Sequence, residues 1–562
     1  MTNVSRNEII KADSRGLRGS IADGLADAVT GAIAEDDTQL TKFHGIYQQD
    51  DRDLRAERMK TRMEKAFSFM ARLRVPGGVL TPAQWLAMEA MARDRGNGTL
   101  RLTTRQTIQF HGIIKSNLRP AIQEINAAML DTIAACGDVN RNVICTPNPA
   151  SAIHDEALAT AHALSAHLLP KSRAWHEIFI DGAPVAGGDA EDEPILGRTY
   201  LPRKFKIAIA IPPYNDVDAF AHELGLIAIE AGGAIAGYNV AVGGGMGMTH
   251  GEPDTFPRTG DLIGFCTPDQ VLAVAEHVVT VQRDFGDRAD RKHARLKYTI
   301  ERIGLATFRA ELERRLGFAL AAPRAFTFTR SGDPSGWITG ADGRWHFALF
   351  VENGRVAGPL LAGLHAVAEA HDGRFILTPN QNLLIADIAP ERRAAIAAIL
   401  AAHRLDAAPS ALRRNAMACV ALPTCGLALA ESERALPGLI DGLEADLAEM
   451  GLGDDEITIR MTGCPNGCAR PYLAEIGLVG VKPGLYNLYL GGAFDGTRLS
   501  KLFRRDIGPD AIRACLRPLF AAYAAQRAPG EHFADFVIRA GAIAATTAGN
   551  RFHEDVPAEL AA

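Results

Sequence analysis

Four cysteines in two short pairs constrain this chain more than any other feature of its sequence. Five residues separate Cys419 from Cys425, and three residues separate Cys464 from Cys468. The second pair lies in a Gly/Pro/Asn turn after residues 456–461, which alternate polar and apolar side chains and predict a strand. Both sulfurs are therefore expected at the end of that strand. Four thiolates in two close pairs are the ligand set of a [4Fe–4S] cluster.

Zinc is the main alternative for these four thiols, and unliganded core cysteines are a further one. Zinc ribbons usually place two residues between paired cysteines, with up to four allowed, so spacings of five and three fit poorly. Gly463 and Gly467 beside the second pair let backbone amides approach sulfur, which tunes the reduction potential of a cluster. The pattern favours the cluster. The remaining cysteines are isolated and are expected to be small apolar core residues: Cys136, Cys145, Cys266 and Cys515.

Length, charge and composition exclude several classes of protein. The 562 residues suggest about three domains, and the net charge of −6 favours neither nucleic acid nor a membrane surface as a partner. No apolar run approaches the roughly 18 residues that span a bilayer, and the N-terminus has no secretory apolar segment. Eight cysteines in such a chain indicate a reducing compartment, so we expect a cytoplasmic protein.

A succession of strand, helix, strand and helix occurs twice, which predicts an internal duplication with pseudo-two-fold symmetry. The second strand of the first copy is expected over residues 101–112, and its counterpart over residues 376–385. Each copy then runs through a helix to an Arg-Asn pair and a cysteine. The identical positions in the aligned strands are Leu102 and Leu377, Thr103 and Thr378, and Gln106 and Gln381.

Cationic side chains of the first copy have no counterparts in the second. Arg101, Arg105 and Gln109 are expected on one face of their strand, and Lys204 and Lys206 on one face of another. A single such residue is more often a solvated surface charge, but these stand among apolar residues. Convergent cations suit a polyanion or an oxyanion substrate. The set is Arg74, Arg101, Arg105, Arg141, Arg203, Lys204 and Lys206.

The chain has no evident binding site for a nucleotide cofactor. The glycine loop 243–247 lacks the final glycine of the dinucleotide fingerprint, and there is no P-loop. Electrons for any redox reaction are therefore expected from a partner. Residues 1–60 are polar, with little apolar periodicity. They predict a loosely ordered arm, either a simple tail or a docking segment for that partner.

In their order along the chain, these motifs resemble the siroheme sulfite and nitrite reductase family from about residue 60 to the C-terminus. The four-cysteine motif is specific to that family. The stretch 200–206 is similar to the hemoprotein (beta) components of assimilatory NADPH-dependent sulfite reductases. The matching stretches are 74–78, 104–112, 140–143, 200–206, 243–245, 417–425 and 462–468.

The resemblance implies a trilobed α+β fold, internally duplicated, with pseudo-two-fold symmetry. Residues 1–60 are expected to be a flexible arm and a dock for a flavoprotein. Residues 61–135 and 336–405 are expected to form paired ferredoxin-like half-domains. Residues 136–335 then form the first α/β repeat domain, with the substrate and siroheme cations, and residues 406–562 the second, with the [4Fe–4S] cluster and the siroheme ligand.

The resemblance also implies a siroheme that is coupled to the [4Fe–4S] cluster through one shared thiolate, which is Cys468 by motif position. The implied cluster ligands are Cys419, Cys425, Cys464 and Cys468. The residues implied to line the face where sulfite binds are Arg74, Arg141, Lys204 and Lys206. Those implied to meet the siroheme carboxylates are Arg101, Arg105 and Arg203, with Gln109 as a neighbour.

The implied activity is the six-electron reduction of sulfite to sulfide, in assimilatory sulfur metabolism and cysteine supply. Electrons are implied to come from a separate flavoprotein (alpha) subunit that carries FAD and FMN and uses NADPH. Nitrite reduction on the same cofactors, or ferredoxin as the donor, is the nearest alternative. A non-catalytic iron–sulfur electron carrier is a different class, and it needs no group of cations.

Overall fold

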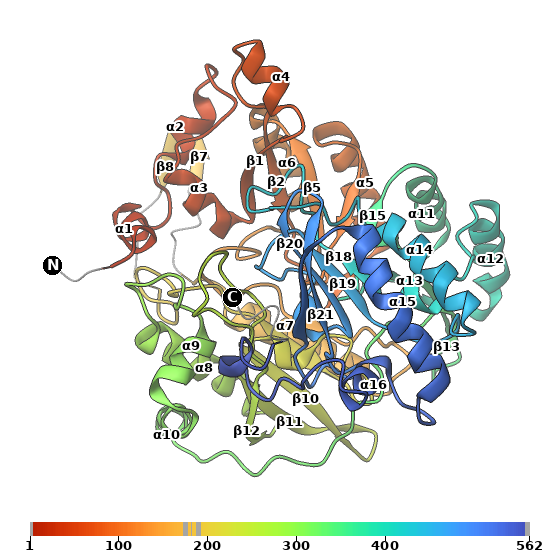
Figure 1. Cartoon of the computed structure of the whole chain (residues 1–562). Helices are drawn as coiled ribbons and strands as arrows, with labels where there is room; N and C mark the ends of the chain where they lie inside the picture. Colours follow the sequence, from red (N-terminus) through yellow and green to blue (C-terminus); the bar gives the residue numbers. More distant parts are fainter. Residues whose placement is uncertain (1–3, 172–177, 181–182, 187–192, 557–562) are drawn as a thin grey trace.

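The structure is a computed structural model that describes residues 4–171, 178–180, 183–186 and 193–556. Its main elements are four five-stranded sheets of two kinds, and each kind occurs once in each half of the chain (Figure 1). The predicted α+β class and internal duplication are confirmed. No helix among the described residues is both long and apolar enough to cross a membrane.

Two antiparallel sheets share one core and exchange edge strands. The short strand β3 lies at the edge of the second sheet, although it belongs to the first half, and β15 makes the reciprocal exchange. Trp85 and Phe110 of the first half therefore pack in the same core as Phe347 and Leu383 of the second. In spatial order, the first sheet contains β1 (Ile46–Asp50), β2 (Phe67–Arg72), β5 (Ile108–Ile113), β4 (Leu100–Leu102) and β15 (Arg355–Val356). The second contains β13 (Gly336–Thr339), β14 (Trp345–Leu349), β17 (Leu383–Ile388), β16 (Arg374–Leu377) and β3 (Val79–Leu80). The helices of this core are α5 (Pro82–Arg95), α6 (Lys115–Ala127), α11 (Gly358–Ala370) and α12 (Arg393–Ala402).

Two mixed sheets follow one topology. Each begins with three neighbouring parallel strands and ends with two antiparallel ones. The first contains β6 (Ile144–Cys145), β9 (Ile207–Ala210), β10 (Leu224–Ala231), β11 (Ala234–Val242) and β12 (Asp261–Cys266). Its helices are α7 (His154–His167), α8 (Val271–Phe285), α9 (Leu296–Ile303) and α10 (Leu305–Leu316). The second contains β18 (Ala416–Ala418), β19 (Ile459–Thr462), β20 (Ile476–Lys482), β21 (Leu485–Leu490) and β22 (Lys501–Ile507). Its helices are α13 (Ala411–Arg414), α14 (Leu436–Glu449), α15 (Pro509–Gln526) and α16 (Phe533–Arg539).

Glycines at matching places show how closely the two mixed sheets correspond. A Cβ on Gly225 in β10 would lie 2.4 Å from the carbonyl oxygen of Ala219, in the 3₁₀ helix η4 (Ala219–Ala221). A Cβ on Gly477 in β20 would lie 2.3 Å from the carbonyl oxygen of Pro471, in η7 (Pro471–Leu473). The same close approach of a 3₁₀ helix to the next strand therefore requires glycine in both halves.

The prediction of a loosely ordered arm over residues 1–60 is wrong for the part that the structure describes. These residues form α1 (Arg6–Asp13), α2 (Ile21–Ala26), α3 (Asp37–Leu40), η1 (Thr41–His44), β1 and α4 (Arg55–Lys60). Leu17, Leu40 and Phe43 are buried in the core of the first mixed sheet, where the ring centroids of Phe43 and Tyr200 lie 5.3 Å apart. These buried apolar residues stand singly among polar ones, so the sequence shows no periodic apolar pattern here.

Candidate functional site

The four cysteines of the sequence motif meet beyond two adjacent strands. Cys419 follows β18, and Cys464 and Cys468 follow β19; these strands are parallel neighbours, so their carboxyl ends lie side by side. Burial, and after it the Cys468 thiol, raises the pKa of Cys419, and the same two causes raise the pKa of Cys425 to about 11. All four thiols therefore lie within electrostatic reach of one another.

Backbone and amide groups donate to these sulfurs. The Gly463 amide lies 3.4 Å from Cys419 Sγ, and the Asn466 side-chain amide lies 3.5 Å from Cys464 Sγ. The predicted approach of Gly463 to sulfur is thus confirmed. Gly467 differs, because its amide donates to the Cys464 carbonyl oxygen at 3.4 Å and its φ of 62° forms the turn. Donors aimed at sulfur stabilise thiolates, which are the form that binds metal.

The four thiols fit a [4Fe–4S] cluster in number and type, because such a cluster takes one thiolate at each of four iron atoms. Within the described residues, no group of three or more His, Cys, Asp or Glu side chains is placed to hold a single metal ion.

Two neighbouring lysines form no ion pair with a described residue, although Glu223 lies within electrostatic reach of Lys206. Lys204 lies within electrostatic reach of Cys468. Lys204 and Lys206 are half-buried, and neither ammonium has a hydrogen bond or ion pair with any residue described. Burial, followed by Arg203, Arg295 and Arg141, lowers the pKa of Lys204 well below its ordinary value. Unpaired cations inside a protein are costly unless an anion joins them. The arrangement therefore fits a bound anionic group.

The cations and the cysteines face the same space. The Cys468 thiol is near enough to Lys204 to raise the pKa of that lysine, although burial and the neighbouring cations outweigh the effect. Burial and Cys468 raise the pKa of Cys464, and Lys204 opposes them. The cation-bearing stretch of the first half thus lies against the cysteine turn of the second.

The glycine loop 243–247 packs directly on the cysteine turn. The Met248 amide donates to the Pro465 carbonyl oxygen at 2.9 Å, and a Cβ on Gly247 would lie 3.1 Å from the Asn466 carbonyl oxygen. The Lys297 ammonium also holds the loop, because it donates to the Gly247 carbonyl oxygen at 2.7 Å. The loop therefore joins the two halves at the site.

Residues 101–112 do not form the single strand that the sequence predicts. They form β4, a tight turn and β5, so Arg101 and Gln109 lie opposite each other across the hairpin. Arg101 is 1% exposed, donates to the Ala418 carbonyl oxygen at 2.8 Å and lies 3.3 Å from Glu433. Arg101 therefore holds in place the backbone of Ala418, the residue directly before Cys419. The expected single strand is therefore wrong, and Arg105 lies in the turn, but Arg101 and Gln109 still share one face of the sheet as direct cross-strand partners.

Arg105 occupies the hairpin turn and points toward the first mixed sheet. It donates to the Ile207 carbonyl oxygen at 3.2 Å and lies 3.4 Å from His222 Nδ1. Burial lowers its pKa to about 9. The Nε of Arg105 and one terminal nitrogen of Arg101 are buried without a partner, as are both ring nitrogens of His111. Such orphaned donors fit an anionic cofactor with several carboxylates.

Arg141 and Arg203 stand beside one buried carboxylate. Arg141 donates to the Gly137 carbonyl oxygen at 3.1 Å, and Arg203 lies 3.8 Å from Asp138. Asp138 also binds Arg291 at 2.8 and 3.0 Å. Burial alone would raise the pKa of Asp138, but Arg291 and the other cations around it hold that pKa well below its usual range. Asp138 therefore fixes the stretch that leads to Lys204.

The structure does not bring Arg74 together with the other predicted cations. Its guanidinium forms a two-point ion pair with Asp131 and donates to Ser165 Oγ at 3.2 Å. Arg72, two residues earlier, lies among the site residues instead. It donates to Cys136 Sγ at 3.1 Å, and its charge lowers the pKa of Arg105 after burial and other cations. The strand β2 ends at Arg72, and Arg74 beyond it pairs with Asp131 in an isolated bridge.

The site also contains buried ion pairs between residues far apart in the chain, and these were not predicted from the sequence. Arg295 donates to Glu223 at 2.7 Å, and Arg460 donates to Asp218 at 2.6 Å. Arg470 shares the Asp218 carboxylate. These partners are up to 252 residues apart, and no local pattern marks them.

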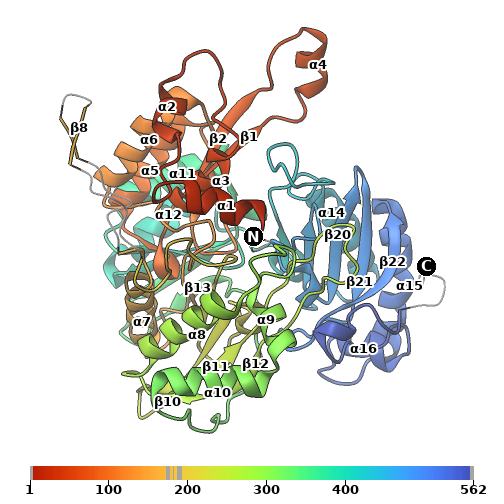
Figure 2. The ribbon, with the colours of Figure 1, turned by 90° about the vertical axis from the view of Figure 1, so that its left-hand side faces the viewer.

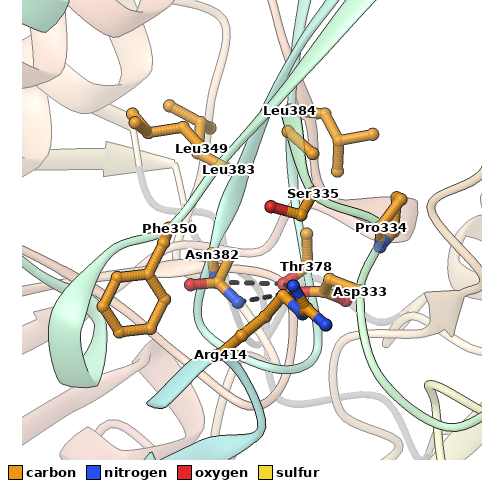
Figure 3. A pocket seen from close by; sticks show the side chains of 11 residues that line it. Asp333, Pro334, Ser335, Leu349, Phe350, Thr378, Asn382, Leu383, Leu384 and Arg414 are labelled. Atoms are coloured by element: carbon orange, nitrogen blue, oxygen red, sulfur yellow. Dashed lines mark hydrogen bonds between the residues drawn. The ribbon is translucent and has the colours of Figure 1, made fainter. Parts of the chain in front are cut away.

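A small pocket beside the second hairpin turn is structural. Figure 3 shows Asp333 pointing at Thr378 and Asn382, whose amide donates to it at 2.9 Å, with Arg414 at the rim. Asp333 also accepts from Asn380 at 2.9 Å. The cavity is about 10 Å³, which is near the minimum for one water. Asp333 therefore stabilises the turn that corresponds to the turn holding Arg105.

Comparisons with known proteins give one family. Residues 62–128 and 338–403 match the family model for a nitrite/sulfite reductase ferredoxin-like half domain. Residues 160–320 match the model for a nitrite and sulphite reductase 4Fe-4S domain.

Relatives with curated names match over nearly the whole chain. One from Methylobacterium nodulans, named sulfite reductase [NADPH] hemoprotein beta-component, is 60% identical over 98% of this chain and 93% of its own. A protein of the same name from Chromohalobacter salexigens is 58% identical over 97% of each chain. Among solved structures, the Mycobacterium tuberculosis NirA protein matches with a TM-score of 0.78 and 26% identity, over 95% of this chain and 96% of that chain.

Proposed function

The chain belongs to the nitrite and sulfite reductase family, and from this we propose that it is an oxidoreductase that reduces sulfite to sulfide by six electrons. The observation that carries the proposal is a group of cations that includes Lys204 and Lys206, with Lys204 next to the cysteine turn and neither lysine in an ion pair with a described residue. A redox cluster next to an anion site suits the reduction of an oxyanion. An electron carrier would not need the cations.

The residues present fit a [4Fe–4S] cluster and a siroheme. We assign the cluster to Cys419, Cys425, Cys464 and Cys468, with Cys468 shared with the siroheme. When bound, these groups supply the place where sulfite is held and the path by which electrons arrive one at a time. We assign Arg101, Arg105 and Arg203, with Gln109 nearby, to the surroundings of the siroheme carboxylates. On this assignment the cations come from residues 61–135 and 136–335, and the thiolates come from residues 406–562.

The chain's own side chains would hold the anion and supply protons. We assign Lys204, Lys206 and Arg141 to sulfite, with Arg74 kept as a proposal that competes with Arg72. Positive charge in a poorly solvated site attracts a dianion more strongly than the same charge in water does. Each oxygen of sulfite leaves as water, so protons must reach it. A lysine whose pKa is lowered gives up a proton more readily than an ordinary lysine.

The relatives are beta-components, so a partner component is implied. We propose that it is an alpha flavoprotein with FAD and FMN that oxidises NADPH. The described chain has eight free cysteines, which supports a reducing location such as the cytoplasm.

The function is tested on the full chain loaded with both cofactors. Reduced methyl viologen serves as the electron donor, and sulfite or nitrite as the acceptor. We expect sulfide release from sulfite, with a kcat/KM for sulfite above that for nitrite. No sulfide, or a preference for nitrite, would contradict the proposal.

A further inference from the structure

We propose that Lys42 is a further anion-binding residue of the site and holds an oxyanion together with Arg141 and Arg203. The oxyanion is either sulfite or a carboxylate of the siroheme, since both present negatively charged oxygens. The inference rests on the proposed function, because it adds a residue to that same site. Lys42 lies in η1, within the residues 1–60 that were expected to form a loosely ordered arm.

The segment that carries Lys42 is fixed on the loop that carries Arg141. The Ala134 amide donates to the Phe43 carbonyl oxygen at 2.9 Å. Gly137 has a φ of 91°, and a Cβ there would lie 2.9 Å from the Phe43 ring, so the two segments touch closely. The Gly137 carbonyl oxygen accepts from the Arg141 guanidinium at 3.1 Å. Phe43 therefore sets the position of its neighbour Lys42 relative to Arg141.

The same segment is anchored on its N-terminal side. Helix α3, directly before η1, lies against the body of the molecule in Figure 2, unlike α4, which projects from it. Leu40 of α3 is 1% exposed, in the core of the first mixed sheet. The Lys42 ammonium donates to the Gln39 side-chain oxygen at 2.6 Å. Lys42 is therefore held in place, in contrast to a lysine that moves freely in solvent.

The Lys42 ammonium is half-buried among cations and has no ion pair with a described residue. Its pKa is lowered to about 8, first by burial and then by Arg291, Arg203 and Arg141, while Asp138 opposes them. A buried ammonium among like charges is costly unless an anion joins it. Lys42 therefore belongs electrostatically to the cation group of the site.

The carboxylate within reach of this group is already bound to other cations. Asp138 accepts from Arg291 at 2.8 and 3.0 Å and lies 3.6 Å from the Lys11 ammonium. Lys42 and Arg141 lie within electrostatic reach of Asp138 but form no ion pair with it. Positive charge is therefore in excess beside Lys42 and Arg141. An oxyanion that contacts both side chains balances this excess.

Tyr47 shows that Lys42 and Arg141 face the same space. The Lys42 ammonium lies 5.6 Å from the centroid of the Tyr47 ring. Burial, followed by Cys136, raises the pKa of Tyr47 to about 12, and the charges of Arg141 and Arg72 oppose this rise. One tyrosine is thus within reach of both cations. Lys42 and Arg141 are therefore neighbours in space, as a shared oxyanion requires.

The test measures sulfite binding and siroheme content separately, on the full chain loaded with both cofactors. Lys42→Met removes the charge, and Lys42→Arg keeps it. Lys42→Gln also removes the charge but can keep a hydrogen bond to Gln39, and it replaces Lys42→Met if that variant does not fold. Sulfite affinity is measured by calorimetric titration, and siroheme per chain by absorption after gel filtration.

The two sources of the oxyanion give different results. If it is sulfite, Lys42→Met should raise the Kd for sulfite about tenfold and leave the siroheme content unchanged. If it is a siroheme carboxylate, Lys42→Met should lower the siroheme retained per chain and leave the Kd of the loaded protein unchanged. In both cases Lys42→Arg should recover most of the loss, because the positive charge is restored.

Lys115→Met is the matched control. Lys115 is also half-buried, and its ammonium also donates to the N-terminal segment, to the Ala32 carbonyl oxygen at 3.1 Å. It lies within electrostatic reach of Glu64 and not in the cation group of the site. Lys115→Met should therefore change neither the Kd for sulfite nor the siroheme content.

The remaining outcomes count against the inference or against the proposed function. An unchanged Kd and an unchanged siroheme content in Lys42→Met would overturn the role of Lys42 while the proposed function stands. A lower unfolding midpoint with equal losses in Lys42→Met and Lys42→Arg would also overturn it, because Lys42 would then only stabilise its segment. If the parent enzyme forms no sulfide with reduced methyl viologen, the proposed function fails, whereas siroheme content still tests Lys42.

Discussion

Asp218 and Arg470 occupy the same place in the two halves of the molecule and form a buried ion pair with each other. Asp218 precedes η4 and Arg470 precedes η7, both in the left-handed conformation, with φ of 49° and 55°. The Asp218 carboxylate also binds Arg460 at 2.6 Å. The duplication thus produced one interface in which equivalent positions carry opposite charges. That interface aligns the cation-bearing half with the cysteine-bearing half.

We expect Asp218→Asn to destabilise the protein by about 3–5 kcal/mol, because it leaves two buried arginines without their counter-charge. The measurement is the thermal unfolding midpoint of the cofactor-loaded protein. Asp372→Asn is the control, since its ion pair with Arg392 at 3.5 Å is largely exposed. Exposed pairs contribute roughly 0–1 kcal/mol, so the control should barely move the midpoint. Equal shifts in the two variants would contradict the role assigned to Asp218.

The same carboxylate predicts a pH dependence of stability. Burial alone would raise the pKa of Asp218, but Arg460 and Arg470 outweigh burial and lower it. An aspartate in the unfolded chain has a pKa of about 3.9. The ionised carboxylate therefore stabilises the fold fully above that pKa, and the contribution is lost as the pH falls toward the lower folded value. As the pH falls below about 4, the unfolding midpoint of the parent protein should therefore decrease more than that of Asp218→Asn, and the two midpoints should approach each other. Parallel midpoint curves against pH would contradict this.

The sequence predicted the features that are local or repeated. Cysteine spacing was enough for the four-thiol site, and repeated motifs were enough for the duplication. The strand over residues 101–112 was predicted too long because its turn lacks glycine and proline at the decisive position. Gln106 takes a φ of 48° there, and Gln381 takes 72° in the second copy. The side-chain amide of Gln106 donates to the Cys145 carbonyl oxygen, and that of Gln381 donates to the Ala418 carbonyl oxygen. These hydrogen bonds offset the strain of the two turns.

Long-range contacts were beyond the sequence. The segment 4–60 is held by isolated buried side chains rather than by a periodic apolar face, so it was predicted as a loose arm. Arg72 and Arg74 stand two residues apart, and only Arg74 was predicted to be a site residue. Only the end of β2 at Arg72 and the presence of Asp131 separate their environments. Neither fact is visible in one sequence.

Arg72 and Arg74 can be separated by substitution. Arg72→Ala should lower kcat/KM for sulfite by about 100-fold, because Arg72 lies with Arg105 at the cation group. Arg74→Ala should mainly lower the unfolding midpoint, since Arg74 is bound to Asp131 and Ser165. Steady-state rates with methyl viologen and thermal unfolding are the two measurements. The reverse pattern would return Arg74 to the substrate group.

The unpaired lysines should be needed for turnover rather than for cofactor assembly. Lys204→Met should retain the siroheme absorption bands and lose about 100-fold or more in sulfite reduction. Lys501→Met is the control, because Lys501 is also buried but donates to the Glu554 carbonyl oxygen, away from the site. Unchanged turnover in Lys204→Met would remove this lysine from the reaction.

The cysteines should differ in what they hold. Cys419→Ser, Cys425→Ser and Cys464→Ser are each expected to lose the cluster, measured as iron and acid-labile sulfide per chain. Cys468→Ser should in addition change the siroheme spectrum, because Cys468 is assigned to both groups. Cys515→Ser, in α15, should change neither quantity. A Cys468→Ser protein with both cofactors and full activity would refute the shared ligand.

The N-terminal helix α1 is predicted to position the basic stretch of the site. The Lys11 ammonium is buried, donates to the Leu201 carbonyl oxygen at 2.9 Å and lies 3.6 Å from Asp138. Arg291 binds the same carboxylate and donates to the Pro202 carbonyl oxygen at 3.4 Å. Leu201 and Pro202 directly precede the cations 203–206. Lys11 therefore acts on the site through the backbone that carries them.

Lys11→Met should raise the KM for sulfite and lower the siroheme content, with a smaller change in kcat. Loss of one buried hydrogen bond to a charged group costs about 1.5–3 kcal/mol, which is enough for a several-fold change in KM if the stretch loosens. Arg6→Met, on the same helix, is the control, because Arg6 is exposed and forms its ion pair with Asp36 at 2.8 Å, away from the stretch 201–206. A lower unfolding midpoint with an unchanged KM and siroheme content would show that Lys11 stabilises the fold alone.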